Sequence, residues 1–313
     1  MSLSTTSQTS GDPVGYAFAI GGAVLFSSKA IFIKLAYAQG ASTETLLALR
    51  MLVALPVYLV ILVALLTRNP SSRTLLKPAL LLPAMAVGLL GYYVSSYLDF
   101  AALNFISAQY GRLVLFTYPF FVVLFGALFF GVPFSWRILP GMLLAYAGIV
   151  LIFGWSFLAE PDGLLIGTCL VLTAAITFAF YQLLAKGQMR QLGTALFTCI
   201  AMSTAAIVAI SQSLVLSGPG ALLSLPSEVW LYGLCLGIFA TVLPSFMMNA
   251  AITRIGPRAN SSTAAFGPFL TIAFAVVVLN EPFTIFHVLG TALVIGGSVL
   301  FTRAERQIRA SGG

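Results

Sequence analysis

Charged residues are scarce in this chain. Asp, Glu, Lys and Arg together make up 7% of its 313 residues, whereas hydrophobic residues make up 60%. A soluble domain carries roughly a quarter charged residues. The composition therefore leaves little room for a soluble catalytic or nucleic-acid-binding domain, so we expect membrane lipid as the solvent and no nucleic-acid partner.

Histidine and cysteine are also nearly missing. The single histidine, His287, cannot supply the histidine clusters of membrane metalloenzymes, and no nucleophile and base stand at a recognisable spacing. The cysteines Cys169, Cys199 and Cys235 lie in apolar segments without metal-ligand spacing, which predicts no disulfide framework. A GxxxxGK[ST] phosphate-binding loop is absent, which argues against direct use of ATP. We expect no metal, no cofactor and no enzymatic activity.

Long apolar runs are what the chain does contain. A helix needs about 20 apolar residues to cross a bilayer. The runs are continuous rather than alternating, which disfavours a β-barrel and predicts an all-α integral membrane protein. Ten segments have suitable length and flanks: residues 14–37, 45–66, 79–102, 108–130, 138–156, 164–185, 194–216, 230–252, 260–279 and 286–302.

The chain repeats itself. Residues 131–153 return 149 positions later as residues 280–302, with seven of 23 positions identical. Shifting the first five apolar segments by 149 positions reproduces the last five. Because five is odd, the second half must lie upside down relative to the first. We therefore expect ten transmembrane helices as two inverted five-helix repeats around a central cavity.

This register predicts the organisation of the whole chain. Lys and Arg are enriched in cytoplasmic loops, and here they lie in alternate connections that share a face with both termini. Both termini are therefore predicted to be cytoplasmic. The expected parts are a disordered cytoplasmic tail at 1–13, a first repeat at 14–158, a second inverted repeat at 163–302 and a basic cytoplasmic tail at 303–313.

Several short motifs stand in a fixed order along the two halves. They are FSSKAIFIK at 26–34, LALR at 47–50, AALNFISA at 101–108, Tyr118-Pro119, and Asn280-Glu281-Pro282 followed by Gly290 and Gly297. In these residues the chain resembles the drug/metabolite transporter superfamily, specifically its ten-helix EamA-type carriers. The resemblance implies a secondary transporter of small metabolites in the bacterial cytoplasmic (inner) membrane, with a YddG-type amino-acid exporter as the nearest subgroup. The chain departs from the family pattern at Val132, where an acidic residue equivalent to Glu281 is usual, which argues against a mechanism that needs both carboxylates.

Ionisable residues inside the predicted helices are few, and each costs at least about 2.5–3.5 kcal/mol at a helix centre. Lys29 has no acidic residue at its depth in the neighbouring sequence, so it is expected to meet a substrate carboxylate or to reach backbone carbonyls. Asp99 and Arg112 flank the third connection symmetrically, which predicts that they pair. Lys34 and Arg50 lie near helix ends and are expected to snorkel. If protons are coupled to transport, Asp99 is the first candidate.

Polar residues form stripes that are expected to line a substrate cavity between the halves. Tyr92, Ser96 and Asp99 share one face of the third predicted helix, although such residues also serve ordinary helix packing. The candidate substrate-binding residues are Lys29, Tyr92, Ser96, Asp99, Tyr118, Thr177, Tyr181, Ser245 and Asn260.

Three prolines interrupt predicted helices. Pro119 and Pro268 are equivalent in the two repeats, and Pro244 lies in the eighth helix. Proline removes a backbone hydrogen bond and kinks a helix. The prolines are candidate gating hinges, or static kinks required only for packing.

The leading interpretation is an amino-acid exporter that works by alternating access. Its expected partners are a small-molecule substrate and membrane lipid, with a coupling proton left open. One polypeptide holds both halves, so a functional monomer is expected. The alternatives are a carrier for nucleotide sugars or cationic drugs, then a channel or an intramembrane enzyme.

Overall fold

The computed structural model describes residues 12–131, 134–159, 162–247, 250, 251, 254 and 267–311. This part of the chain is helical and contains no strand. The first half comprises α1 (Pro13–Ser27), α2 (Lys29–Ala38), α3 (Thr43–Arg68), η1 (Pro70–Leu75), α4 (Pro78–Gly88), η2 (Leu89–Val94), α5 (Ser95–Ala102), α6 (Ala108–Leu115), α7 (Tyr118–Phe129), η3 (Trp136–Ile138) and α8 (Leu139–Ala159). The second half comprises α9 (Leu164–Leu192), α10 (Thr194–Leu216), α11 (Pro219–Leu223), α12 (Ser227–Gly237), η4 (Ile238–Val242), α14 (Gly267–Leu279) and α15 (Ile285–Ser311).

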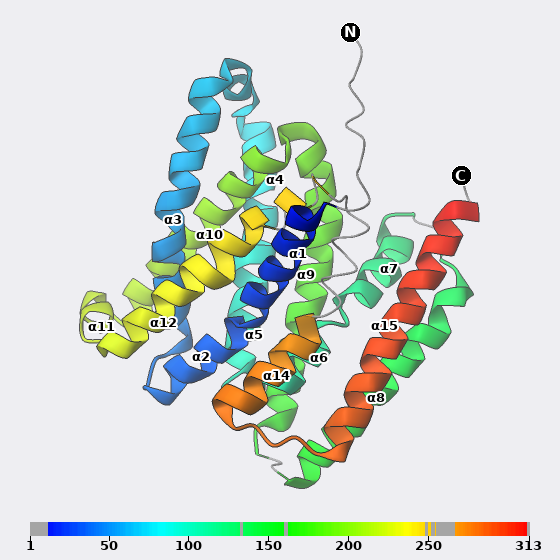
Figure 1. The fold of residues 1–313 in the computed structure, drawn as a ribbon. Coiled ribbons are helices and arrows are strands. Elements are labelled where there is room, and N and C mark those ends of the chain that lie inside the picture. Colours follow the sequence, from blue (N-terminus) through cyan, green and yellow to red (C-terminus); the bar gives the residue numbers. More distant parts are fainter. Residues whose placement is uncertain are drawn as a thin grey trace.

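These helices account for the ten predicted segments. Eight helical stretches are long and apolar enough to cross a membrane, and the shorter apolar helices Gly267–Leu279 and Ile285–Phe301 correspond to the last two segments. The prediction of an all-α membrane protein is confirmed. In Figure 1 the start of α1 and the end of α15 point toward one end of the bundle, and the connections from α2 to α3 and from α14 to α15 lie at the other.

Two π-helical turns reveal the repeat in the backbone. The turn η2 interrupts the third span and η4 interrupts the eighth, and their first residues, Leu89 and Ile238, are 149 positions apart. A π-turn is a rare feature that occurs mostly as a single turn inside an α-helix. Its recurrence at the same register therefore supports the duplication independently of the sequence identities.

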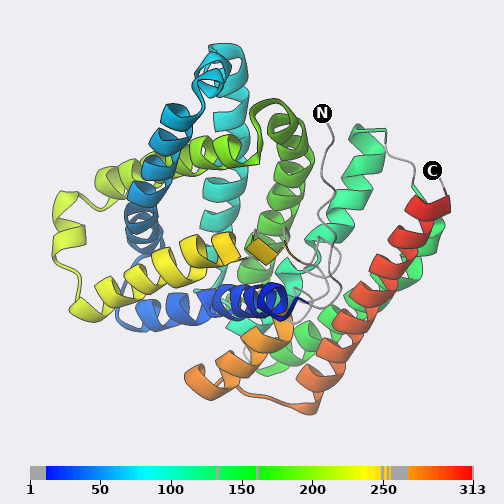
Figure 2. The same cartoon turned by 45° about the horizontal axis from the view of Figure 1, so that its top comes forward.

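The crossing of α8 and α15 shows that the repeats are inverted. The backbone of Gly141 lies against Gly297, and that of Gly148 lies against Gly290, so closely that a Cβ atom on any of the four would meet backbone of the other helix. Gly141 and Gly290 are equivalent in the repeat, as are Gly148 and Gly297. Equivalent helices can exchange partners in this way only if they run antiparallel. Figure 2 shows the two helices side by side along one edge of the molecule.

Several spans are broken rather than continuous. The first span bends between α1 and α2, where Ser28 interrupts the helix. The fourth span is interrupted between α6 and α7 at Phe116 and Thr117, just before Pro119. Proline lacks an N–H and its ring clashes with the carbonyl four residues earlier. Residues next to both breaks line the cavity described below.

Candidate functional site

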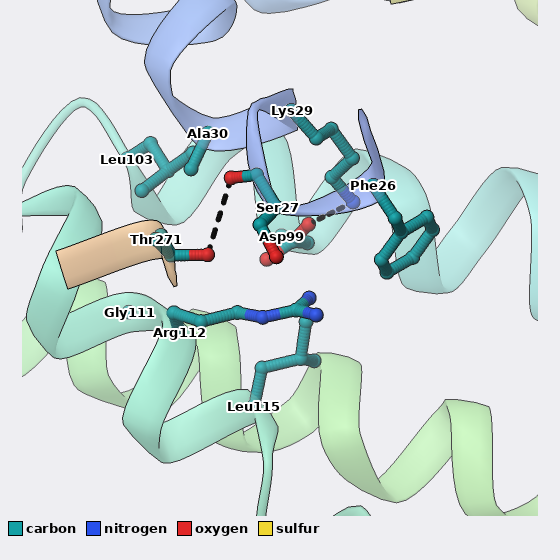
Figure 3. A pocket seen from close by; sticks show the side chains of 10 residues that line it. All are labelled: Phe26, Ser27, Lys29, Ala30, Asp99, Leu103, Gly111, Arg112, Leu115 and Thr271. Carbon is teal, nitrogen blue, oxygen red and sulfur yellow. Dashed lines mark hydrogen bonds and ion pairs between the residues drawn. The ribbon is translucent and has the colours of Figure 1, made fainter. Parts of the chain in front are cut away.

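A narrow cavity lies where the broken helices meet. Its walls come from α1, α2, α5 and α6 of the first repeat and from α14 of the second. Its volume is about 10 Å³, room for about one water molecule, so the side chains that line it nearly close it. Figure 3 shows the lining residues, which are Phe26, Ser27, Lys29, Ala30, Asp99, Leu103, Gly111, Arg112, Leu115 and Thr271.

An ion pair between Lys29 and Asp99 crosses this cavity. Lys29 Nζ donates to Asp99 Oδ2 at 2.5 Å, and the two side chains are only 12% and 10% exposed. The prediction that Asp99 pairs with Arg112 is wrong, and so is the expectation that Lys29 has no acidic partner. The prediction weighed only the depth of each residue and its neighbours in sequence, whereas Lys29 at the start of α2 reaches Asp99 on α5, 70 positions away.

Arg112 lies across the cavity from this pair. Its side chain extends from α6 beneath Lys29 and Asp99 (Figure 3). The guanidinium carbon lies 5.0 Å from the centre of the Phe26 ring, a distance typical of a cation–π contact. The buried Nε atom has no hydrogen-bond partner among the described residues. Gly267 leaves room for the guanidinium, because a Cβ there would lie 3.2 Å from Arg112 Nη2.

Two hydroxyl groups tie the repeats together at the cavity. Ser27 Oγ donates to the carbonyl of Gly267 at 3.0 Å. Thr271 Oγ1 in turn donates to the carbonyl of Ser27 at 3.1 Å. Ser27 was not among the predicted site residues, although a pair of serines within an apolar run is a signal that could have indicated it. Both bonds join α1 of the first repeat to α14 of the second.

Arg50 forms a second buried positive centre. The residue is 6% exposed, and its Nε donates to Thr241 Oγ1 at 2.8 Å, which links α3 to the π-turn of the second repeat. Its Nη1 has no hydrogen-bond partner in the described part of the chain. The expectation that Arg50 snorkels is wrong, because α10 and α12 pack over α3 and keep it from the surface. Lys29 and Arg50 lie 5.6 and 5.5 Å from the centre of the same Phe100 ring.

Three predicted aromatic residues gather beside this region. Tyr181 Oη donates to Tyr92 Oη at 2.8 Å, and their rings lie 5.1 Å apart. Tyr118 and Tyr181 both contact Phe178, with ring centres 5.1 and 5.6 Å apart. Phe178 is the repeat equivalent of Lys29, so the second repeat has an aromatic residue where the first has a cation.

Thr177, Ser245 and Ser96 are not among the residues that line the cavity. Thr177 donates to the carbonyls of Thr173 and Ala174 of its own helix, at 2.9 and 3.0 Å. Ser245 likewise donates to the carbonyl of Val242 at 2.6 Å. Ser96 is half-buried on α5. Asn260 lies outside the described residues, so its predicted role in binding is not examined by the geometry.

Two candidate hinges stand at helix discontinuities. Pro119 is the second residue of α7, after the interruption at Phe116 and Thr117. Pro244 follows the π-turn η4 after one residue. Pro268 is the second described residue of α14. The movement of all three prolines during transport stays a prediction.

A second contact between the repeats involves Glu281, in the loop before α15. Its carboxylate accepts hydrogen bonds from the backbone N–H groups of Ala108 at 2.6 Å and Gln109 at 3.2 Å, and so caps the N-terminus of α6. Gln109 Nε2 also donates to the carbonyl of Pro282 at 2.8 Å. Burial raises the pKa of Glu281, and the two backbone bonds partly offset that rise.

The fold and this cavity define the class of protein: a multi-pass membrane transporter built from two inverted repeats with a polar site between them. Residues 13–154 and 165–303 match the EamA-like transporter family, and the chain belongs to that family. The described residues hold no group of three or more His, Cys, Asp or Glu side chains that could bind a metal ion.

The relatives agree on the class. The uncharacterized transporter YcbK of Bacillus subtilis is 28% identical over 88% of this chain and 88% of its own length. The uncharacterized transporter YyaM of the same organism is 26% identical over 68% of this chain and 70% of its own length. One crystal structure of a protein covers 94% of this chain and 98% of its own length, with a TM-score of 0.63 and 22% identity, which supports the fold alone.

Proposed function

We propose that this protein is a secondary transporter that exports an amino acid from the cytoplasm by alternating access. Membership of the EamA-like transporter family supports a small-molecule substrate. The observation that carries the proposal is the ion pair of Lys29 and Asp99 beside Arg112, in a cavity lined by both repeats. Substrate sites in repeat carriers lie at such interfaces, between discontinuous helices.

An amino acid has the two charges that this cavity can pair with. Arg112 presents a planar fork of N–H donors, which suits a carboxylate. Asp99 can accept hydrogen bonds from the substrate ammonium group once the ion pair between Lys29 and Asp99 separates. The same separation would let Asp99 take a coupling proton. The substrate ammonium thus takes the place of Lys29 at Asp99, and the substrate carboxylate gives the cations Lys29 and Arg112 a counter-charge.

The contacts between repeats support alternating access. One set joins Ser27 to Gly267 and Thr271 at the cavity, and the other joins Glu281 to the start of α6 near one end of the bundle. In our proposal, one set of contacts opens while the rest of the interface holds. The break before Pro119 and the π-turn before Pro244 supply bending points, with Pro268 as a further proposed hinge.

A carrier for nucleotide sugars is the second candidate. The cations Lys29 and Arg112 would suit the phosphates of such a substrate, and the same cations disfavour a cationic drug. A counterflow screen separates these functions. Purified protein in liposomes would be loaded with one unlabelled compound and offered the same compound with a label, across amino acids, nucleotide sugars and cationic drugs. Uptake of an amino acid above protein-free liposomes is expected, and exchange of cationic drugs alone would reject the proposal.

A further inference from the structure

We propose that the central cavity selects substrates of net negative charge, which narrows the amino acid to an acidic one or a related dicarboxylate. This inference rests on the proposed transport function and deepens it. Its basis is a charge imbalance among the residues around the cavity, together with two arginine N–H groups for which the described residues supply no hydrogen-bond acceptor.

The imbalance follows from the residues whose charges act on Lys29. Among the described residues these are Asp99, Arg50 and Arg112. Together the four side chains carry three positive charges and one negative charge, which leaves a formal surplus of two positive charges inside the membrane-spanning helices. Buried charges without counter-charges are costly. A neutral zwitterion adds no net charge and leaves the surplus unchanged, whereas an acidic amino acid reduces it by one and a dicarboxylate by two.

The unpartnered donors point in the same direction. Arg112 Nε and Arg50 Nη1 are both buried, and neither has a hydrogen-bond partner among the described residues. Arg112 lines the cavity directly, so it is the residue that receives a substrate carboxylate (Figure 3). Arg50 lies behind Phe100, against whose ring Lys29 also packs, and contributes its positive charge without lining the cavity.

The cavity is closed around its ion pair. Its volume is about 10 Å³, room for about one water molecule, and the pair of Lys29 and Asp99 crosses the space. A substrate therefore enters only when this pair separates and the walls move apart, which presents the cations Lys29 and Arg112 to its carboxylates. Asp99 remains available to an amino group if the substrate has one.

Matched pairs of ligands test the inference on the purified full-length protein. Thermal unfolding would be followed with L-aspartate against L-asparagine and with succinate against succinamide, because each pair differs mainly in charge, with L-lysine as a cationic probe. A ligand that binds the folded state raises the unfolding temperature. We expect a rise with aspartate or succinate at concentrations where the amides and lysine produce none.

Variants then assign the selection to the two arginines. We expect Arg112→Gln to lower the preference for aspartate over asparagine about tenfold or more, and Arg50→Gln to lower it less. Arg254→Gln is the matched control, since it removes one positive charge from an exposed residue that pairs with Asp12. If Arg112→Gln acted only by disturbing the structure, it would weaken the binding of aspartate and of asparagine equally. Arg112→Lys keeps the positive charge and should retain part of the preference for aspartate.

The outcomes separate this inference from the proposed function. Counterflow of a neutral amino acid with no preference for an acidic one would overturn the inference and leave the carrier function standing. Equal protection by aspartate and asparagine, stronger protection by lysine, or protection by none of the five probes would each overturn it. A preference unchanged in both arginine variants would overturn the assignment to Arg112 and Arg50.

Discussion

Lys29 and Asp99 join the bend of the first span to α5 through an ion pair 2.5 Å long. The two residues are 70 positions apart in sequence, and neither has a charged equivalent in the second repeat. The pair therefore marks a point where the duplicated halves differ chemically, and the backbone differs there too, because the first span breaks at Ser28 whereas α9 runs unbroken through the equivalent Thr177. The predictions below follow from this pair and from the contacts around it.

Removing one member of the pair should be more harmful than removing both. Asp99→Asn leaves the Lys29 ammonium buried without its carboxylate, and breaking such a pair typically costs about 3–5 kcal/mol. Adding Lys29→Met to Asp99→Asn should recover part of this loss. Thermal unfolding of the two single variants and the double variant measures the coupling. Losses that simply add would show that the ion pair contributes no stability.

Thr241 should stabilise the protein through Arg50. Thr241→Val removes the acceptor of the Arg50 Nε hydrogen bond and leaves a second buried donor of that guanidinium unsatisfied. A loss of about 1–3 kcal/mol in unfolding free energy is expected. Thr198→Val is the matched control, because Thr198 donates only to the carbonyl of Thr194 in its own helix. Equal effects of the two variants would contradict the role given to Arg50.

The crossing of α8 and α15 should not tolerate a methyl group. Gly148→Ala places a Cβ against the Gly290 carbonyl and Leu293, and overpacking of this kind costs typically about 1–3 kcal/mol. Gly154→Ala, on the same helix, meets nothing within 4 Å and should be neutral or stabilising, since alanine is the better helix former. Unfolding temperatures of the two variants provide the comparison. A stable Gly148→Ala protein would mean that the helices do not cross at this point.

Glu281 should make stability depend on pH in one direction. Burial raises its pKa in the folded protein above the ordinary 4.5, so the folded state favours the protonated carboxyl. The stability that this carboxyl contributes is full at pH below 4.5 and declines as the pH rises through the raised pKa. Glu281→Gln removes the titration, so the stability of the wild type relative to this variant should fall across that interval. A relative stability that rises with pH would contradict the assignment.

The membrane spans and the internal repeat could be predicted from the sequence. Hydropathy is a local property, and the recurrence of residues 131–153 at 280–302 set the register that the π-turns at Leu89 and Ile238 then reproduced. The antiparallel crossing of Gly141 with Gly297 follows from the odd number of helices in each half. These features required no knowledge of which helices pack together.

Partner choice inside the bundle could not be predicted in the same way. Arg50 and Thr241 are 191 positions apart, and their hydrogen bond depends on how three helices pack. The predicted pairing of Asp99 with Arg112 failed because the connection between α5 and α6 places them near one cavity but does not orient their side chains. Depth in the membrane is readable from a sequence, whereas rotation of each helix about its axis is set by long-range packing.

The most direct test of the central claim is counterflow through Lys29→Ala in proteoliposomes. The wild type should accumulate a labelled amino acid against a preloaded unlabelled pool, and Lys29→Ala should abolish that accumulation at an equal amount of reconstituted protein. Lys186→Ala, which removes a lysine outside the cavity walls, should behave as the wild type. Exchange at the wild-type rate by Lys29→Ala would show that the cavity between Lys29, Asp99 and Arg112 is not the substrate site.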